Sequence, residues 1–496
     1  MRGRRKEWAV SGTVRVFKNM LSLLSDRVLV PLLNLLIVVC IARVMGTKGL
    51  GQYSAVVGFV SFFDIFLDLG MDTLIIREVS RDRSSAHRIS SKAMTLKLAV
   101  FPFVLVSIAV FLSFFSYPPD VVHAFYIFSA AFLLAALSDT YTSLFKAWER
   151  MDLHAFIALV SQVVLLVGIT AAAYAGYGIT GMAIANLIVC ALSLVFSHII
   201  FNRKLDRVMP GLDMNFHKRL FDHSLPFITL GFFFMMFHRV DVVSVSAVAG
   251  DVEAGYFSVA SKISASLLLL SAVFLEAVFP IISRYEQDAD AKMRTAVKNS
   301  FHLLSIVSFP MAVGLALTGG EFVRMLFGPG FGNSTPMLAV LSFTFPFAYL
   351  ASALHYVAIA REMQKKSFFG IVVTVVVWAL ICIMLVVRYG GMGAAIATLA
   401  MTVSVFLFLA RLVFREVRDY SALTEMLRPL AAALVMAASL YMMRDVWVVL
   451  RAVAGAAVYA AALWAMGGVY QADARRFREI WRHFIPDSAG GREAGS

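Results

Sequence analysis

The chain has 496 residues, of which 60% are hydrophobic and only 15% are charged, with a net charge of +13. Soluble globular proteins average nearer to about 45–50% apolar and about 25% charged residues. This composition excludes a soluble enzyme and a disordered chain, and it predicts an all-α polytopic membrane protein.

The apolar runs predict fourteen membrane-spanning helices. A helix needs roughly 20 apolar residues to cross about 30 Å of hydrocarbon, and its backbone polar groups must be bonded internally. Runs of this length, bounded by charge, Gly or Pro, fall at residues 20–45, 53–79, 93–115, 122–146, 154–175, 181–201, 223–249, 256–283, 296–319, 334–358, 368–388, 391–413, 428–446 and 448–470.

The basic residues predict the orientation of these spans. Thirty-four of the 44 lysines and arginines lie in segments that a cytoplasmic N-terminus places inside, and cytoplasmic loops carry such an excess. We therefore expect a multi-pass protein of the cytoplasmic membrane with both termini inside. The basic loops would face anionic phospholipids, and no nucleic-acid partner is expected. Six cations fall in the predicted outer segments: Arg43, Lys48, Arg324, Arg388, Arg444 and Arg451.

Two motifs occur twice and predict an internal repeat. Residues 46–54 and 250–258 both read G-x4-G-x2-S, and residues 177–185 and 389–397 both read Y-G-x2-G-x-A-I-A. Each pair lies at matching places in two sets of six spans. An even number of spans per set predicts two parallel lobes around a central cleft, an arrangement that alternating-access transporters use.

These features predict the domain organisation. It consists of a cytoplasmic basic arm (1–19), an N-lobe (20–201), a cytoplasmic linker (202–222), a C-lobe (223–413), a final helix pair with its preceding loop (414–470) and a cytoplasmic tail (471–496). The apolar run that follows the basic arm lacks a small-residue cleavage site, which indicates a first span rather than a removed signal peptide.

Six short stretches of the sequence together resemble a known family. They are residues 42–46 (Ala-Arg-Val-Met-Gly), 51–54 (Gly-Gln-Tyr-Ser), 68–72 (Asp-Leu-Gly-Met-Asp), 76–78 (Ile-Arg-Glu), 239–241 (Arg-Val-Asp) and 255–262 (Gly-Tyr-Phe-Ser-Val-Ala-Ser-Lys). This pattern resembles polysaccharide flippases of the Wzx type, which belong to the multidrug/oligosaccharidyl-lipid/polysaccharide exporter superfamily. The resemblance implies movement of an oligosaccharide linked to a polyprenyl phosphate or diphosphate, without a cofactor, with glycan-assembly proteins as partners.

Four cations inside apolar runs are candidates for substrate binding. A charge at mid-bilayer costs about 2.5–3.5 kcal/mol on insertion scales, so such residues face a cavity or a partner. The candidates are Arg239, Lys262, Arg27 and Lys97. We expect them to hold the phosphate or diphosphate that joins the sugar to its lipid. Pairing with internal acids is the alternative, and Arg27 and Lys97 lie near the inner ends of their spans, where side chains reach the headgroups.

Three acids are candidates for binding a coupling cation such as Na⁺ or H⁺: Asp64, Asp68 and Asp241. Asp64 and Asp68 are four residues apart and share one helix face. Helix capping, or pairing with Arg77, is the alternative for these two acids, and Asp241 is placed to pair with Arg239.

Two other functions remain open alongside the flippase. A cation-coupled multidrug antiporter of the same superfamily would need a net acidic cleft, and the buried acids here nearly balance the bases. A membrane-embedded glycan enzyme is disfavoured because the predicted outer loops are short, and because the sequence contains no P-loop, HExxH or GxSxG motif. We therefore do not expect an enzyme.

Overall fold

The computed structural model describes residues 29–204, 239–283 and 290–468, apart from residues 69, 116 and 418. Helices and turns fill these ranges, and no strand occurs in them. In the same part of the chain, ten segments are long and apolar enough to cross a membrane. These findings confirm an all-α, multi-pass membrane protein. The count of fourteen spans stays a prediction, and the basic arm, the tail, Arg27 and most of the linker lie outside the described residues.

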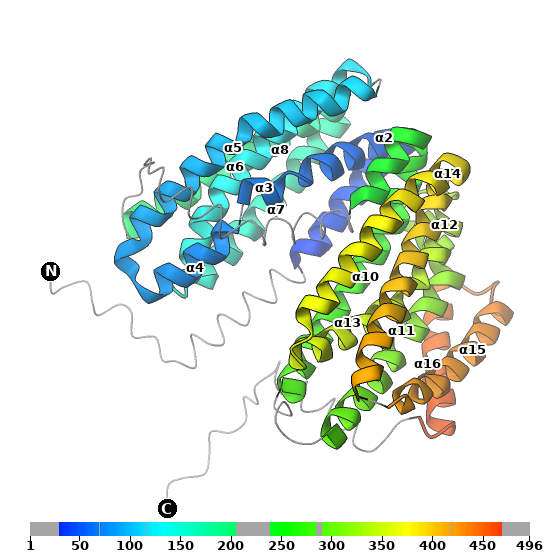
Figure 1. The fold of residues 1–496 in the computed structure, drawn as a ribbon. Coiled ribbons are helices and arrows are strands. Elements are labelled where there is room, and N and C mark those ends of the chain that lie inside the picture. Colours follow the sequence, from blue (N-terminus) through cyan, green and yellow to red (C-terminus); the bar gives the residue numbers. More distant parts are fainter. Residues whose placement is uncertain are drawn as a thin grey trace, which may run out of the picture. The chain divides into compact units, whose positions relative to one another are not determined.

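The chain divides into two compact units. Unit 1 comprises Met1–Val259 with Cys382–Ala394, and unit 2 comprises Ala260–Ile381 with Ala395–Ser496. Helices that lie wholly in unit 1 are α2 (Val30–Ser61), α3 (Asp64–Asp68), α4 (Met71–Arg81), α5 (Ala86–Phe114), α6 (Pro119–Ala147), α7 (Met151–Tyr174) and α8 (Gly178–Lys204), with the short η3 (Arg83–Ser85), and Figure 1 labels these α-helices. Residues 239–249 of unit 1 are also helical.

Two helices contain segments of both units: α10 (Asp251–Ser283) and α14 (Gln364–Val417). Helices that lie wholly in unit 2 are α11 (Asp290–Phe327), α12 (Ser334–Ser342), α13 (Thr344–Ala360), α15 (Leu427–Met442) and α16 (Val448–Ala465), with the short η4 (Pro329–Phe331) and η5 (Ser421–Met426).

Single glycines divide the two longest apolar segments. Gly46 interrupts α2 with φ of 68°, and Gly390 interrupts α14 with φ of 57°. Positive φ favours glycine because a Cβ would clash with the backbone. The helix resumes directly after each glycine, so the turn predicted over residues 46–52 is much shorter than expected. Both breaks fall where the hydropathy pattern separates consecutive spans.

Unit 1 is held together by apolar stripes on α4, α5, α6 and α8. Met71, Ile75 and Val79 recur every four residues along α4 and are fully buried, as expected for one helix face turned to the core. They belong to one cluster with Phe145 of α6 and Phe201 of α8. This packing fixes α4 against the helices that carry the charged residues described below.

Unit 2 is built around α11, and the two last helices pack on it. Residues of α15 and α16 form an apolar cluster with Ile306 and Phe309 of α11, and the Tyr459 hydroxyl of α16 donates to the Ile306 carbonyl at 2.9 Å. The helix pair outside the predicted repeat is therefore attached to the second half of the chain.

Arg451, counted with the outer segments in the sequence-based prediction, lies in the first turn of α16, within the predicted last span, and is only 3% exposed. Its guanidinium contacts the Glu321 carboxylate of α11 and donates to the Arg444 carbonyl at 2.9 Å. The partly exposed Glu321 carboxylate compensates in part for the loss of water around the buried cation.

Candidate functional site

The two copies of the first repeated motif contact each other inside unit 1. A Cβ added at Gly51 would lie 1.7 Å from the Asp251 carbonyl oxygen, and one added at Gly255 would lie 2.0 Å from the Thr47 carbonyl oxygen. In both copies the sixth motif position therefore touches the second position of the other copy. The first glycines, Gly46 and Gly250, share positive φ values of 68° and 89°. This reciprocal geometry supports the internal repeat that the sequence predicts.

Polar side chains close around this backbone contact. The Gln52 amide donates to the Asp251 carboxylate at 3.0 Å, across 199 residues of sequence. Glu253, two residues further along α10, accepts a hydrogen bond from the Gly391 backbone N–H at 3.1 Å. Asp251 and Glu253 lie in the first turn of α10, where the helix dipole favours acidic groups. We name this set the glycine seam: Thr47, Gly51, Gln52, Asp251, Glu253, Gly255, Gly390 and Gly391.

The second repeated motif also has the same backbone in both copies. Gly178 and Gly390 occupy equivalent positions and have φ values of 59° and 57°. Gly390 lies against Glu253, whose Oε2 would be 3.1 Å from an added Cβ. Glu253 therefore links the second-half copy of this motif to the glycine seam.

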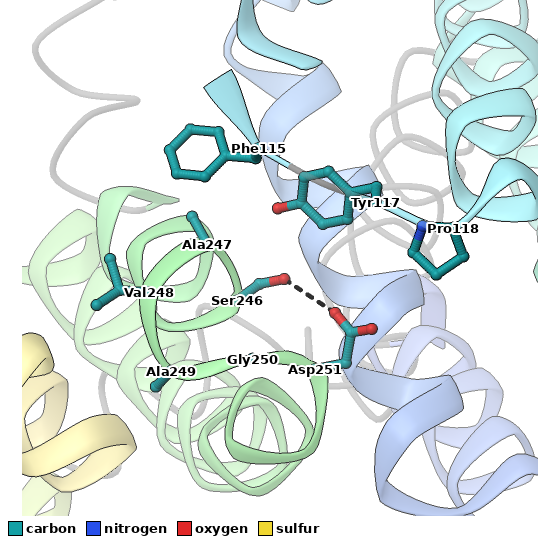
Figure 2. Close-up of a pocket in the computed structure, with 9 residues that line it drawn as sticks. All are labelled: Phe115, Tyr117, Pro118, Ser246, Ala247, Val248, Ala249, Gly250 and Asp251. Carbon is teal, nitrogen blue, oxygen red and sulfur yellow. Dashed lines mark hydrogen bonds between the residues drawn. The ribbon is translucent and has the colours of Figure 1, made fainter. Parts of the chain in front are cut away.

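A pocket of about 360 Å³ opens beside the seam (Figure 2). It is lined by Phe115, Tyr117, Pro118 and residues 246–251. The Ser246 hydroxyl donates to Asp251 at 3.2 Å, so the same carboxylate is shared by the pocket and the seam. Burial raises the pKa of Tyr117, a hydrogen bond with Ser246 opposes that rise, and the nearby Asp251 charge adds to it. Tyr117 therefore remains a neutral hydroxyl at physiological pH.

A second polar site lies within the helices of unit 1 and centres on Lys97 of α5. This lysine is 0% exposed, and its ammonium lies 3.2 Å from Asp72 Oδ1, 3.7 Å from Asp68 Oδ1 and 2.8 Å from the Ala136 carbonyl oxygen. We name Lys97, Asp68, Asp72 and the Ala136 carbonyl the lysine cluster. Complete burial is not compatible with snorkelling to the headgroups, and the contacts match the alternative of internal pairing.

Asp68 has a second role at the break between α3 and α4. Its carboxylate accepts hydrogen bonds from the backbone N–H groups of Gly70 and Asp72, both at 3.2 Å. Gly70 is left-handed with φ of 72°, so the predicted second span is interrupted there. These contacts match the capping alternative for Asp68. The Arg77 guanidinium lies 3.8 Å from the Glu78 carboxylate.

The remaining predicted site residues are distributed over both units. Arg239 is half-buried in unit 1, and its charge acts on Asp64 and Tyr53. Asp241 accepts from the Val242 backbone N–H at 2.7 Å. Lys262 is half-buried on α10, in unit 2. The structure thus places Lys97, Arg239 and Asp64 in unit 1, whereas Lys262 belongs to unit 2.

Two acids near Lys97, Asp72 and Asp139, are not among the predicted site residues. Asp72 follows Asp64 and Asp68 at the same four-residue spacing, and that periodicity could have identified it. Asp139 of α6 interacts electrostatically with Asp72, Lys97 and Asp64. It lies on a different span, 42 residues after Lys97, and no sequence spacing indicates that contact.

A family model described as "Polysaccharide biosynthesis protein" matches residues 40–336. The chain belongs to this family. The match includes both copies of the first repeated motif and the whole lysine cluster. It confirms the resemblance that the motif residues suggested.

Two curated relatives have related names. The chain is 20% identical over 366 residues to the "Probable low-salt glycan biosynthesis flippase Agl15" of Haloferax volcanii, covering 72% of this chain and 75% of that one. It is 20% identical over 312 residues to the "Teichuronic acid biosynthesis protein TuaB" of Bacillus subtilis, covering 62% and 63%.

Solved transporters share the fold. The "Lipid II flippase MurJ, inward closed conformation" superposes with a TM-score of 0.71 at 16% identity, over 95% of this chain and all of that chain. An inward-facing multidrug resistance MATE family transporter of the MOP superfamily superposes with a TM-score of 0.58 at 15% identity, over 80% and 99%. These likenesses show that the chain shares the fold of these transporters.

Proposed function

We propose that this protein moves a lipid-linked oligosaccharide, carried on a polyprenyl phosphate or diphosphate, from the inner to the outer leaflet of the cytoplasmic membrane. The family and the names of its relatives support a glycan substrate. The observation that carries alternating access is the reciprocal glycine contact. Backbone surfaces that meet through glycine, with few side chains between them, can separate and meet again without repacking a core.

In this proposal the glycine seam closes the outer side while the headgroup enters from the cytoplasm. The basic inner segments hold both termini in the cytoplasm and face anionic phospholipids. In this proposal Arg239 contacts the anionic linkage between lipid and sugar, and the same role for Lys262 and Arg27 stays a prediction. Arginine suits this role because its planar fork can reach two phosphate oxygens at once.

The membrane potential supplies a driving force for this transport. Moving one negative charge outward across an inside-negative membrane gains about 2.3 kcal/mol per 100 mV. A diphosphate gains about twice that if it crosses the full field, so turnover requires no ATP. Coupling to Na⁺ or H⁺ through Asp64 or Asp241 is a further part of the proposal, and glycan-assembly proteins are the proposed partners.

Replacing Arg239 by alanine is expected to lower the initial transport rate at least about tenfold, because a hydrogen bond to a charged group contributes about 1.5–3 kcal/mol. Arg239→Lys should have an intermediate transport rate, because lysine keeps the positive charge but lacks the planar guanidinium group that contacts two phosphate oxygens. The measurement is outward movement of a labelled polyprenyl-diphosphate sugar in proteoliposomes. Arg324→Ala, which removes an exposed arginine of α11, serves as the matched control and should transport within about twofold of wild type.

Two outcomes would contradict these assignments separately. Equal transport by wild type and both Arg239 variants would remove Arg239 from the mechanism. Transport of the labelled lipid at the protein-free rate, together with export of organic cations by the wild-type protein, would replace the flippase by the antiporter.

A further inference from the structure

The span that carries the two acids of the lysine cluster, Asp68 and Asp72, is discontinuous. It consists of the end of α2 at Ser61, the five-residue α3 and then α4 from Met71, with left-handed Gly70 between the last two. A break inside a membrane span frees backbone groups, and transporters use such breaks to build ion and substrate sites. Asp68 satisfies two of the freed N–H groups, and its Oδ1 also faces the Lys97 ammonium.

The surroundings of the Lys97 ammonium have the composition of a cation site. Its three partners are oxygens, two from carboxylates and one from a backbone carbonyl, and they come from α3, α4 and α6. Hard cations are bound by oxygen donors of these kinds. The ammonium donates hydrogen bonds to Asp72 and to the Ala136 carbonyl, and it forms an ion pair with Asp68 at 3.7 Å. The ammonium therefore stands where a free monovalent cation would otherwise bind.

The acidic side chains around Lys97 are stabilised by a permanent positive charge at this position. Asp64 and Asp139 add two further carboxyl groups within electrostatic reach of Lys97. Removing the lysine charge would leave Asp68 and Asp72, whose side chains are each 31% exposed, as neighbouring carboxylates without their shared cation, which is destabilising. Direct contact of Lys97 with a substrate headgroup is not compatible with its complete burial.

We propose that Lys97 is a tethered counterion: its ammonium, covalently attached to α5, pairs with Asp68 and Asp72 at the break in the second span. The lysine cluster therefore needs no free cation. Lys97 acts as a positioning residue: it holds α3 and α4 in register through Asp68 and Asp72, and it anchors both to α6. Deleting its side chain creates a site for a free monovalent cation, with preference for an alkylammonium ion that can donate hydrogen bonds. This inference concerns the cation and holds whichever lipid the protein transports.

The test is chemical rescue of Lys97→Ala, measured as thermal unfolding of the full chain in detergent at constant ionic strength. Compared with lysine, alanine lacks three side-chain carbons and the terminal nitrogen, and n-propylammonium contains these same four heavy atoms. We expect the Tm to fall by about 5 °C or more, and to recover by at least half with saturating propylammonium chloride. Tetramethylammonium, which has the same charge but no N–H donor, should not restore it. Wild type and Lys366→Ala, an exposed lysine, should respond to neither salt.

Further variants separate the proposal from a general loss of packing. In Lys97→Ala/Asp72→Asn the net charge of the cluster returns to its wild-type value with Asp68 as the one remaining carboxylate, so propylammonium should raise the Tm clearly less than in Lys97→Ala. If Lys97→Ala cannot be purified, Lys97→Met keeps the side-chain volume, and Lys97→Met/Asp72→Asn should then be more stable than Lys97→Met alone.

Three results would overturn the proposal. They are equal rescue by the two ammonium salts, Lys97→Met as stable as wild type, or stabilisation of the wild-type protein by Na⁺ over K⁺ that is lost in Asp72→Asn. The last measurement depends on no lysine variant. A protein that fails to transport the labelled lipid but behaves as expected here would refute the proposed function and leave the tethered counterion standing.

Discussion

Replacing Gly51 by alanine is expected to prevent closure of the glycine seam and to reduce transport at least about tenfold. The new methyl carbon would stand 1.7 Å from the Asp251 carbonyl oxygen, so the backbones of the two motif copies would have to move apart. Overpacking costs about 1–3 kcal/mol where side chains can adjust, and a backbone atom adjusts less. Because the contact is reciprocal, Gly255→Ala should have the same effect through Thr47.

Gly58→Ala is the matched control for this experiment. Gly58 also lies in α2, but a Cβ there would meet the Val243 Cγ2 atom at 3.5 Å, which is ordinary van der Waals contact. Transport by Gly58→Ala should therefore remain within about twofold of wild type. Equal transport by the Gly51→Ala and Gly58→Ala proteins would show that seam closure is not required for transport.

Opening of the glycine seam by Gly51→Ala should also be detectable in an experiment that does not measure transport. Ser246 lies against Asp251 and is only 5% exposed. In a background without the three native cysteines, Ser246→Cys should react slowly with a membrane-impermeant maleimide. Adding Gly51→Ala should raise the labelling rate several-fold, whereas adding Gly58→Ala should not. This measurement distinguishes an open seam from an unfolded protein when it is combined with the Tm of each variant.

The repeated motifs explain why part of the site could be predicted. A turn that requires positive φ leaves glycine at fixed positions, so Gly46 and Gly250, and likewise Gly178 and Gly390, mark equivalent places in the chain. Hydropathy located the spans because the bilayer imposes their length. Both signals come from local requirements of the backbone, which a single sequence retains.

The break at Gly70 and the pairing of Lys97 have no comparable local signal. The mean hydropathy over a window of about 20 residues is insensitive to the backbone conformation of a single residue. Residues 53–79 are therefore predicted as one continuous span. The contacts of Lys97 join residues 25 and 39 positions apart, and the packing of α4, α5 and α6 determines them. Sequence alone identified the buried cation and left open whether its partner is the substrate or an internal acid.

Arg451 shows the same limitation at the end of the chain, because a cation near a span boundary reads as a loop residue. Replacing it by methionine is expected to lower the free energy of unfolding by about 2–4 kcal/mol. Breaking a buried pair costs about 3–5 kcal/mol, and the value should be reduced here because the Glu321 side chain is 34% exposed. The measurement is denaturant unfolding in detergent micelles.

A double-mutant cycle separates the ion pair from the packing of α16. Arg451→Met with Glu321→Gln should be less destabilised than the sum of the single variants, with a coupling energy of at least about 1 kcal/mol. Arg428→Met is the matched control. Arg428 donates to the Gly467 carbonyl at 3.0 Å from an exposed position on α15, so its replacement should cost below about 1 kcal/mol. If Arg451→Met unfolds like wild type, the apolar cluster around Met436, Leu440 and Tyr459 alone must hold α15 and α16 on α11.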